Sequence, residues 1–275
     1  MIIDAHHHFW DPATADYPWL TDELAPIRRR FGPEDLVPLL LRRGIDGSIV
    51  VQARSSLDET RDLLATAAEV SWLVGVVGWV DLTDPAIDDV LARLRGGRLV
   101  GIRHQVHDEP DPEWLLRADV DRGIEALERA GLAYDLLVRA RELPAALELA
   151  RRHPGVRFVV DHLAKPPVRG GDTRDWAEGL AALAALPNVS CKLSGLVTEA
   201  DWKGWSAAEL LPYFERALEW FGPERSLYGS DWPVCLLAAG YDEVVDLLLA
   251  ALEKSERAAV MGGTARRVYR LDEPA

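Results

Sequence analysis

The chain has 275 residues, 48% of them hydrophobic, and a formal net charge of -14. This acidic balance argues against nucleic acid and anionic membranes as partners, because both require a basic surface. No apolar run has the 18 or so residues of a membrane helix, no targeting segment precedes the first strand, and the two cysteines exclude a disulfide framework. We therefore expect a cytoplasmic protein that binds a small molecule, and the sequence leaves open a homo-oligomer.

Short apolar runs rich in β-branched residues alternate along the chain with segments of helical periodicity. Such alternation is typical of parallel strands that are joined by helices. Eight strands are predicted, over residues 1–7, 47–52, 73–80, 99–104, 133–138, 156–162, 188–194 and 225–230.

Start and stop signals support the helices between these strands. Ser56 and Glu59 fit a capping box, and Asp84 with Pro85 fits a capped helix start. Gly131 stands where a helix would end. Helices are predicted from Ser56 to about residue 70 and over residues 86–94, 121–130, 144–152, 175–186, 207–221, 241–254 and 258–269.

Eight strands that each precede a helix predict an α/β protein with one domain over residues 1–275, a closed (β/α)8 TIM barrel. A Rossmann fold is disfavoured because no Gly-x-Gly-x-x-Gly turn follows a strand. The connection over residues 8–33 has no clear periodicity but holds Trp10, Tyr17, Trp19 and Phe31. We interpret it as a long aromatic loop at the barrel mouth, either a lid over substrate or an edge that packs on a neighbour.

The first predicted strand ends in three consecutive histidines. Because side chains alternate along a strand, His6 and His8 face the same way as Asp4, while His7 faces the other way and is interpreted as structural. A tag or a surface patch is the alternative, but a tag would not lie between an apolar strand and the aromatic pair Phe9-Trp10. Imidazole is the commonest protein ligand for metals, so the pair predicts a cation site with further ligands elsewhere.

Polar residues also end other predicted strands, which in a barrel is where functional groups gather. Their side chains would be costly to bury separately, so we expect them to share a site. The strand-end residues are His6, His8, Gln52, Arg54, Arg103, His104, Asp161, His162, Lys192, Ser194, Ser230 and Asp231.

These residues differ in what else they could do. Asp231 needs a cation or an activated water, unless it caps a helix or pairs with an arginine, and His162 faces inward unless it is a core residue. Arg103 and His104 lie on opposite faces of a regular strand; we favour Arg103 as an anion or carbonyl binder and leave His104 open. Lys192 either faces the site or extends to solvent.

Five blocks of the sequence resemble, in order, those of the amidohydrolase-related lactonases. This branch of the amidohydrolase superfamily includes L-fuconolactonase, L-rhamnonolactonase and the pyrone dicarboxylate lactonase. The blocks lie at residues 4–10, 101–104, 160–166, 192–195 and 228–233, and the similarity extends through the terminal block at residues 262–271.

The resemblance implies that His6 and His8 are metal ligands, that Asp231 is the last-strand acid, and that His162 is a further ligand or a proton shuttle. One departure is that residues 133–138 lack the histidine that binuclear members carry on their fifth strand. We therefore expect at most one divalent cation, with Zn²⁺ favoured. The pyrone lactonase works without metal by analogy, so the resemblance leaves open whether the cation is required.

The implied activity is hydrolysis of a sugar-derived lactone to its free acid, within carbohydrate catabolism. Asp231 and His162 would carry the proton transfers, and a metal, Arg103 or Lys192 would stabilise the oxyanion. We predict that substrate is bound by Arg103, His104, Lys192 and Trp232. The alternatives are a pyrone dicarboxylate lactonase, a metal-dependent decarboxylase of the same superfamily, and a non-catalytic barrel that binds a sugar acid.

Overall fold

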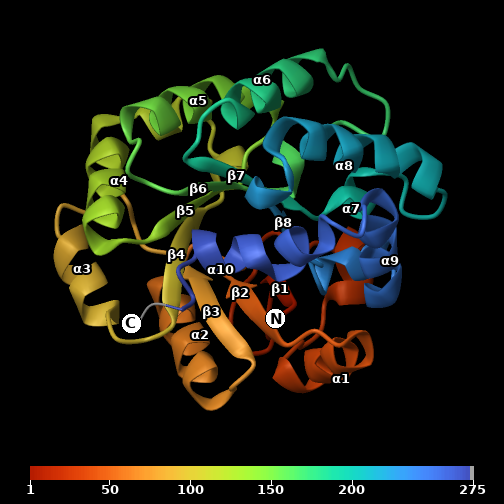
Figure 1. Ribbon diagram of the computed structural model, residues 1–275. Coiled ribbons are helices and arrows are strands. Elements are labelled where there is room, and N and C mark those ends of the chain that lie inside the picture. Colours follow the sequence, from red (N-terminus) through yellow and green to blue (C-terminus); the bar gives the residue numbers. More distant parts are fainter. Residues whose placement is uncertain (273–275) are drawn as a thin grey trace.

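Eight parallel strands form one sheet whose order follows the chain (Figure 1). The structure is a computed structural model that describes residues 1–272, so the last three residues of the predicted domain lie outside the described range. The predicted (β/α)8 barrel is confirmed. Its strands are β1 Ile3–His7, β2 Gly47–Val51, β3 Leu73–Gly78, β4 Leu99–His104, β5 Ala133–Leu136, β6 Phe158–Val160, β7 Val189–Leu193 and β8 Ser226–Tyr228.

The barrel closes where the chain that leaves β8 meets β1. The backbone N–H of Asp231 donates to the carbonyl oxygen of His6 at 2.8 Å. The N–H of His8 donates in turn to the carbonyl oxygen of Trp232 at 2.7 Å. We call this junction the seam, and it lies at the carboxyl end of both strands.

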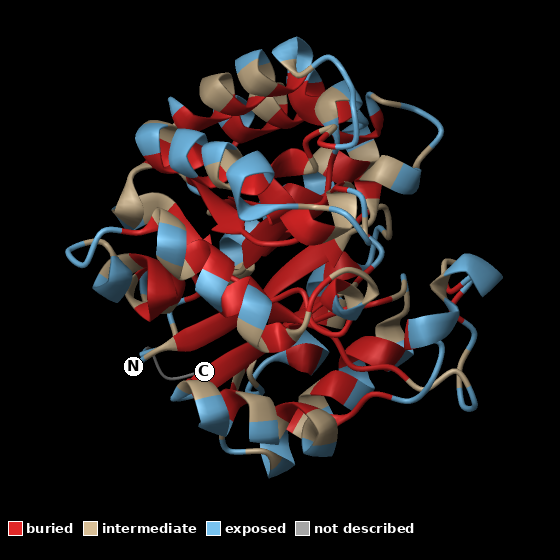
Figure 2. Ribbon diagram, turned by 90° about the vertical axis from the view of Figure 1, so that its right-hand side faces the viewer, coloured by how far each residue is buried: buried red, intermediate tan, exposed pale blue. Residues whose placement is uncertain are grey.

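Helices surround the barrel and present their buried faces to it (Figure 2). The hydroxyl of Ser56 accepts from the N–H of Glu59, which confirms one half of the predicted capping box. The other half is wrong, because the Glu59 carboxylate accepts from the N–H groups of Ala53 and Arg54. Gly131 ends its helix in the left-handed conformation, as predicted. The helices are α1 Pro33–Arg43, α2 Leu57–Glu69, α3 Ile87–Leu94, α4 Ala118–Ala130, α5 Leu143–Arg152, α6 Arg174–Ala184, α7 Leu196–Glu199, α8 Ala207–Phe221, α9 Tyr241–Ala251 and α10 Thr264–Val268.

Helix α1 was not predicted from the sequence. It begins directly after the aromatic loop, and Pro38 interrupts its hydrophobic pattern. Leu41 is 74% exposed, so an apolar residue lies on the solvent face of the helix. This position weakens the hydrophobic periodicity by which a helix is predicted from sequence.

The predicted terminal helix over residues 258–269 is divided in two. A wide turn, Ala259–Gly263, precedes the short helix α10. The turn packs against the start of β1, where a Cβ atom on Gly262 would lie 2.3 Å from the carbonyl oxygen of Met1. Only glycine permits this approach, which holds the C-terminal segment against the amino-terminal end of the barrel.

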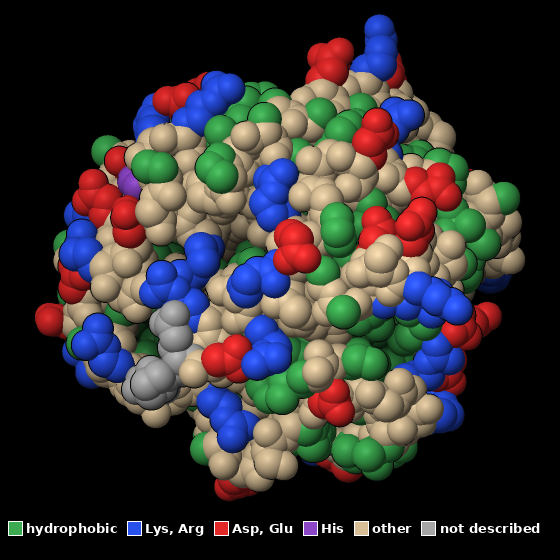
Figure 3. All heavy atoms as spheres, viewed as in Figure 1, with side chains coloured by type: hydrophobic (Ala, Val, Ile, Leu, Met, Phe, Trp, Pro, Cys, Tyr) green, Lys and Arg blue, Asp and Glu red, His purple; other side chains and the backbone are tan. Residues whose placement is uncertain are grey.

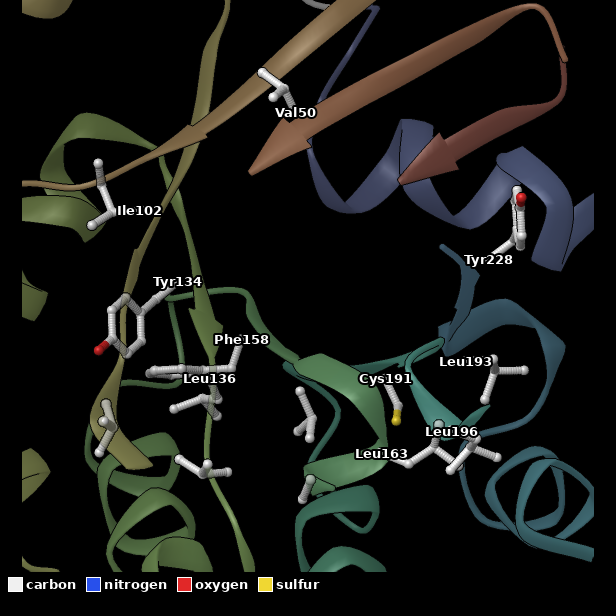
Figure 4. Close-up of a cluster of buried hydrophobic side chains, with 14 of the residues drawn as sticks. Val50, Ile102, Tyr134, Leu136, Phe158, Leu163, Cys191, Leu193, Leu196 and Tyr228 are labelled. Atoms are coloured by element: carbon white, nitrogen blue, oxygen red, sulfur yellow. The ribbon is translucent and has the colours of Figure 1, made fainter. Parts of the chain in front are cut away.

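Apolar side chains on the two faces of the strands form separate layers, as alternation requires. Outward-facing residues such as Ile102, Tyr134 and Phe158 pack beneath the helices (Figure 4). Inward-facing residues form a smaller cluster inside the barrel. Its members are Ile3, Ala5, Ile49, Val51, Val77, Ala133, Val159 and Leu227, with Ala265 and Tyr269 from the C-terminal segment.

The aromatic loop packs on the rim of its own barrel. Trp10 and Phe31 form an antiparallel bridge that draws its two ends together, and Phe31 lies edge-on to Trp232 with ring centroids 5.3 Å apart. The indole N–H of Trp19 donates to the carbonyl oxygen of Ala53 at 2.7 Å. These contacts fix the loop beside the carboxyl ends of β1 and β2.

Acidic and basic side chains are interspersed over the face that carries α10 (Figure 3). Within residues 1–272, no helix is both long enough and apolar enough to cross a membrane.

Candidate active site

Three predicted ligands meet at the seam. The Nε2 atoms of His6 and His8 are 3.2 Å apart. Oδ1 of Asp231 lies 3.4 Å from Nε2 of His8 and 3.8 Å from Nε2 of His6. All three side chains are buried, and their ligand atoms converge on one point at the barrel mouth.

A bulge in β1 places Asp4 on the opposite face of the strand from His6 and His8. The pairing of β1 with β2 shifts between Asp4 and His7, so one extra residue lies in β1. His7 faces outward to the hydroxyl of Ser48, as predicted. Asp4 also faces outward and accepts from the hydroxyl of Tyr241, so the expectation that Asp4 shares the face of His6 is wrong.

The donor set fits a divalent cation. Zinc bonds of about 2.1 Å in a tetrahedron place neighbouring ligand atoms about 3.4 Å apart, which is close to the separations among His6, His8 and Asp231. Nδ1 of His8 donates to the carbonyl oxygen of Val51 at 2.8 Å, which leaves the lone pair of Nε2 facing the other two ligands. Two imidazoles and one carboxylate leave a fourth position for water or substrate.

His162 lies beside this trio. Its ring centroid is 4.4 Å from that of His6, and its Nε2 atom is 3.8 Å from Oδ1 of Asp231. Its Nδ1 atom is 2.8 Å from the hydroxyl of Ser194. His162 can therefore exchange a proton with a group at Asp231 or join the ligands.

The predicted sixth strand over residues 156–162 ends early. Strand β6 stops at Val160, and residues 162–165 all have φ between 50° and 56°. Four consecutive left-handed residues other than glycine are costly and mark a constrained site. The turn brings both Asp161 and His162 next to His6, whereas regular alternation would have separated them.

Burial sets the protonation of these groups. It lowers the pKa of His6 far below its usual value and that of His162 to about 4. Burial alone would raise the pKa of Asp231, but the neighbouring imidazoles outweigh it and hold that pKa below its usual value. Neutral imidazoles beside an ionised carboxylate are the forms that bind metal.

Arg103 reaches the same point from β4. Its Nη1 atom lies 3.3 Å from Nε2 of His6 and 3.0 Å from Oδ2 of Asp161. Its Nη2 atom donates to the carbonyl oxygen of Gln52, whereas Nε is buried without a partner among the described residues. The structure thus places a fixed guanidinium at the edge of the ligand trio.

His104 and Trp232 lie apart from the trio. His104 accepts from the indole of Trp79, contacts Glu109 at 2.7 Å and stacks on Trp114 with centroids 4.2 Å apart. Trp232 is only 2% exposed and packs on the aromatic loop. The binding of substrate by these two residues stays a prediction.

Lys192 lies one layer deeper and has no exposed surface, so it does not extend to solvent. Its Nζ atom is 2.5 Å from Oδ2 of Asp135, 3.0 Å from Oδ1 of Asp161 and 3.2 Å from Nδ1 of His6. It therefore contacts the side of His6 that faces away from the mouth. Its predicted contact with substrate remains a prediction.

The sequence interpretation missed Asp135 and Tyr269. The hydroxyl of Tyr269 lies 2.9 Å from both carboxylate oxygens of Asp135. Asp135 could have been recognised from the sequence, because it is an acidic residue between Tyr134 and Leu136 on a buried strand. Nothing in the sequence marks Tyr269 as a functional residue except its position in the terminal block at residues 262–271.

A cavity of about 370 Å³ lies beside the mouth, among the loops that follow β1, β2 and β4. Ring contacts link it to the trio: Trp10 lies between His8 and Trp19, with centroid distances of 6.2 and 5.1 Å. The cavity is lined by Asp16, Pro18, Trp19, Arg54, Ser55, Ser56, Gln105 and Asp108. A larger cavity of about 520 Å³ opens near the amino-terminal ends of β3 and β4, away from the ligand trio.

Known proteins resemble the chain over its whole length. The amidohydrolase family model matches residues 3–271. L-fucono-1,5-lactonase from Burkholderia multivorans is 44% identical, with 100% of this chain and 98% of that protein covered, and its counterpart from Burkholderia ambifaria is 41% identical, with 99% and 96% covered. A zinc-bound crystal structure of an amidohydrolase from Burkholderia multivorans superposes with a TM-score of 0.94 at 42% identity, covering 98% of this chain and 99% of that one. The chain belongs to the amidohydrolase family.

Proposed function

We propose that this protein hydrolyses a sugar-derived lactone to its free acid, with L-fucono-1,5-lactone as the first candidate substrate. The observation that carries the proposal is the meeting of His6, His8 and Asp231 in one buried cluster at the barrel mouth. Two relatives at 41% and 44% identity that span the chain are named as L-fucono-1,5-lactonases, which supports this substrate.

We assign one Zn²⁺ ion to this cluster, held by His6, His8 and Asp231. The zinc-bound relative and the nitrogen and oxygen donor set both support the choice of metal. When bound, such an ion lowers the pKa of a water molecule and polarises a carbonyl group.

Side chains of the protein would carry out the proton transfers and stabilise the developing negative charge. Asp231 would take a proton from the attacking water and return it to the ring oxygen that leaves, with His162 as the neutral relay beside it. Arg103 would donate to the lactone carbonyl oxygen as negative charge develops there. Its unpartnered Nε atom and its fixed guanidinium fit this role, because a preorganised donor needs no rearrangement during the reaction.

A pH-indicator assay with L-fucono-1,5-lactone tests the proposal. Wild-type protein should release acid, and Asp231→Asn should lower the rate by about 10³-fold, as expected for loss of a general base. Removal of metal with a chelator should stop turnover, and added Zn²⁺ should restore it. Asp246→Asn, an exposed change on α9, is the matched control. Full activity of Asp231→Asn, or inactivity of the wild type toward every lactone in a panel of sugar lactones and pyrones, would refute the proposal.

We also propose that the enzyme acts in the cytoplasm, within carbohydrate catabolism, on a small-molecule lactone and on neither nucleic acid nor membrane. The net charge of -14 supports this choice of partner. Growth of a deletion strain on the parent sugar, together with fractionation of the cells, is the test of this assignment.

A further inference from the structure

A buried carboxylate connects the two sides of the seam from the outer face of the barrel. Oδ1 of Asp4 accepts from the backbone N–H of Ser230 at 2.9 Å and from that of His6 at 3.2 Å. Its Oδ2 atom accepts from the hydroxyl of Tyr241, the first residue of α9, at 2.9 Å. Asp4 has no exposed surface, so bulk water does not compete for these hydrogen bonds. One side chain therefore fixes the backbone of β1 relative to the chain that follows β8.

The backbone at Asp231 is in a strained conformation. Its φ of 55° lies in the left-handed region, which costs a residue with a Cβ atom about 1 kcal/mol. Such a conformation persists only where the surrounding structure holds it. It also sets the direction of the Cα–Cβ bond, and with it the direction of the carboxylate toward His6 and His8. The ligand geometry of Asp231 thus depends on the contacts that maintain the left-handed conformation.

Hydrogen bonds hold the residues on both sides of Asp231. The N–H of Ser230, which precedes it, donates to Asp4. The hydroxyl of Ser230 accepts from the N–H of Trp232, which follows it, at 3.1 Å. Ser230 is itself fully buried. We call Asp4, Ser230 and Tyr241 the brace, because together they hold the backbone on either side of Asp231.

We propose that the brace keeps Asp231 in its left-handed conformation and so positions its carboxylate as a metal ligand and general base. Asp4 and Ser230 act through the backbone, and Tyr241 acts by fixing the carboxylate of Asp4. All three are positioning residues, and none belongs to the ligand trio. This inference rests on the proposed function. It gives a role to Asp4 and Ser230, two residues of the strand-end motifs that the proposed reaction does not use.

Ser230→Ala is the first test, because it removes the hydroxyl that binds the N–H of Trp232 and leaves the trio intact. The affinity of the metal-free variant for Zn²⁺, measured by competition with a chromophoric chelator, should fall by about 10-fold, the lower limit for loss of a group that supports a metal ligand. At saturating Zn²⁺ its kcat for L-fucono-1,5-lactone should fall by about as much, with KM unchanged because the substrate-binding side chains are the same.

Ser226→Ala is the matched control on the same strand. Ser226 is as buried as Ser230, and its hydroxyl donates to the carbonyl oxygen of Gly222 at 2.8 Å, at the end of β8 away from the seam. The control should therefore lose thermal stability but keep the Zn²⁺ affinity and kcat of the wild type.

Substitutions of Asp4 separate positioning from a merely structural role. Asp4→Asn keeps an oxygen acceptor for both N–H groups and should retain most of the Zn²⁺ affinity and kcat. Asp4→Leu removes the acceptor at similar volume and should lose at least as much as Ser230→Ala. Where Asp4→Leu does not fold, Tyr241→Phe takes its place and should lower kcat. Tyr134→Phe should not, because the buried hydroxyl of Tyr134 has no hydrogen-bond partner among the described residues.

The outcomes distinguish the brace from the proposed function. Wild-type Zn²⁺ affinity and kcat in Ser230→Ala would overturn this inference alone. Equal values for Asp4→Asn and Asp4→Leu, or equal kcat of Tyr241→Phe and Tyr134→Phe, would do the same. A wild type inactive toward every lactone would overturn the proposed function, and the Zn²⁺ affinity of Ser230→Ala would then still test the brace.

Discussion

Nδ1 of His8 lies 2.8 Å from the carbonyl oxygen of Val51, so the backbone of β2 sets the tautomer of this ligand. A carbonyl oxygen accepts hydrogen bonds and never donates one, and the Nε2 atom of His8 is therefore always free to bind. His6 differs, because its Nδ1 atom faces ionisable side chains. Of the two imidazoles, only His6 has a ligating state that depends on the protonation of side chains.

Replacement of His8 by alanine should weaken Zn²⁺ binding by more than about 100-fold, since loss of a supporting group alone costs 10- to 100-fold. The remaining ligands, His6 and Asp231, are too few to hold the ion. Chelator competition gives the affinity, and circular dichroism should show an unchanged fold. His107→Ala, outside the trio, is the control, and an affinity for Zn²⁺ equal to that of the wild type would remove His8 from the site.

Gly195 and Gly170 make a matched pair for the orientation of His162. Both are left-handed, with φ of 70° and 94°, so the backbone strain of an alanine should cost about 1 kcal/mol of stability at either position. A Cβ atom on Gly195 would lie 2.5 Å from Nδ1 of His162, whereas one on Gly170 would meet nothing within 4 Å. Gly195→Ala should therefore lower kcat strongly, and Gly170→Ala should not. Thermal unfolding and lactone hydrolysis of both variants check this, and equal kcat values would contradict it.

Glu59 makes stability depend on pH. Its carboxylate accepts from the N–H groups of Ala53 and Arg54, but burial raises its pKa from 4.5 to about 7. The folded state therefore binds the proton more tightly than the unfolded state. The resulting stabilisation is fully present below pH 4.5 and is lost as pH rises through 7, by about 3 kcal/mol.

Glu59→Gln keeps an acceptor for both N–H groups and cannot ionise. Relative to the wild type, this variant should gain stability between pH 4.5 and 8. Urea unfolding at several pH values measures the difference, and Glu69→Gln at the exposed end of α2 controls for net charge. Parallel pH profiles for the wild type and Glu59→Gln would show that Glu59 does not titrate in this range.

The cavity beside the mouth should recognise the hydroxyl groups of the sugar lactone. Trp19 offers an aromatic face, and Arg54 and Gln105 offer hydrogen bonds. Trp19→Ala should lower kcat/KM for L-fucono-1,5-lactone by about 10-fold more than for unsubstituted δ-valerolactone, because only the sugar has hydroxyl groups to lose. Trp220→Ala on α8 is the control. An equal loss on both substrates would mean that the cavity does not contact the sugar.

The barrel and the ligand trio could be predicted because both follow from local rules. Alternation along β1 distinguishes His6 and His8 from His7, and parallel strands bring Asp231 to the same end of the barrel. The bulge that moves Asp4 to the outer face could not be seen, because nothing in the sequence marks an extra residue. The prediction succeeded for the histidines because both lie beyond the bulge.

The surroundings of Lys192 could not be predicted for a different reason. Alternation predicts that the side chain of Lys192 points into the barrel, but its complete burial depends on its contacts with the carboxylates of Asp135 and Asp161. A buried charge is tolerated only through its partners, and the pairing arises only in the folded barrel. The left-handed turn after β6 could not be predicted either, because glycine is the usual sequence mark of a left-handed conformation and none of residues 162–165 is a glycine.

The seam has a consequence for how the enzyme is made. The ribosome releases His6 and His8 well before Asp231, and the two groups meet only when the chain after β8 closes on β1. A partial barrel that lacks β8 therefore carries two imidazoles without their carboxylate. Contacts so distant in sequence form late in folding. Acquisition of activity should then report completion of the barrel, and a nascent or truncated chain should remain inert toward lactones.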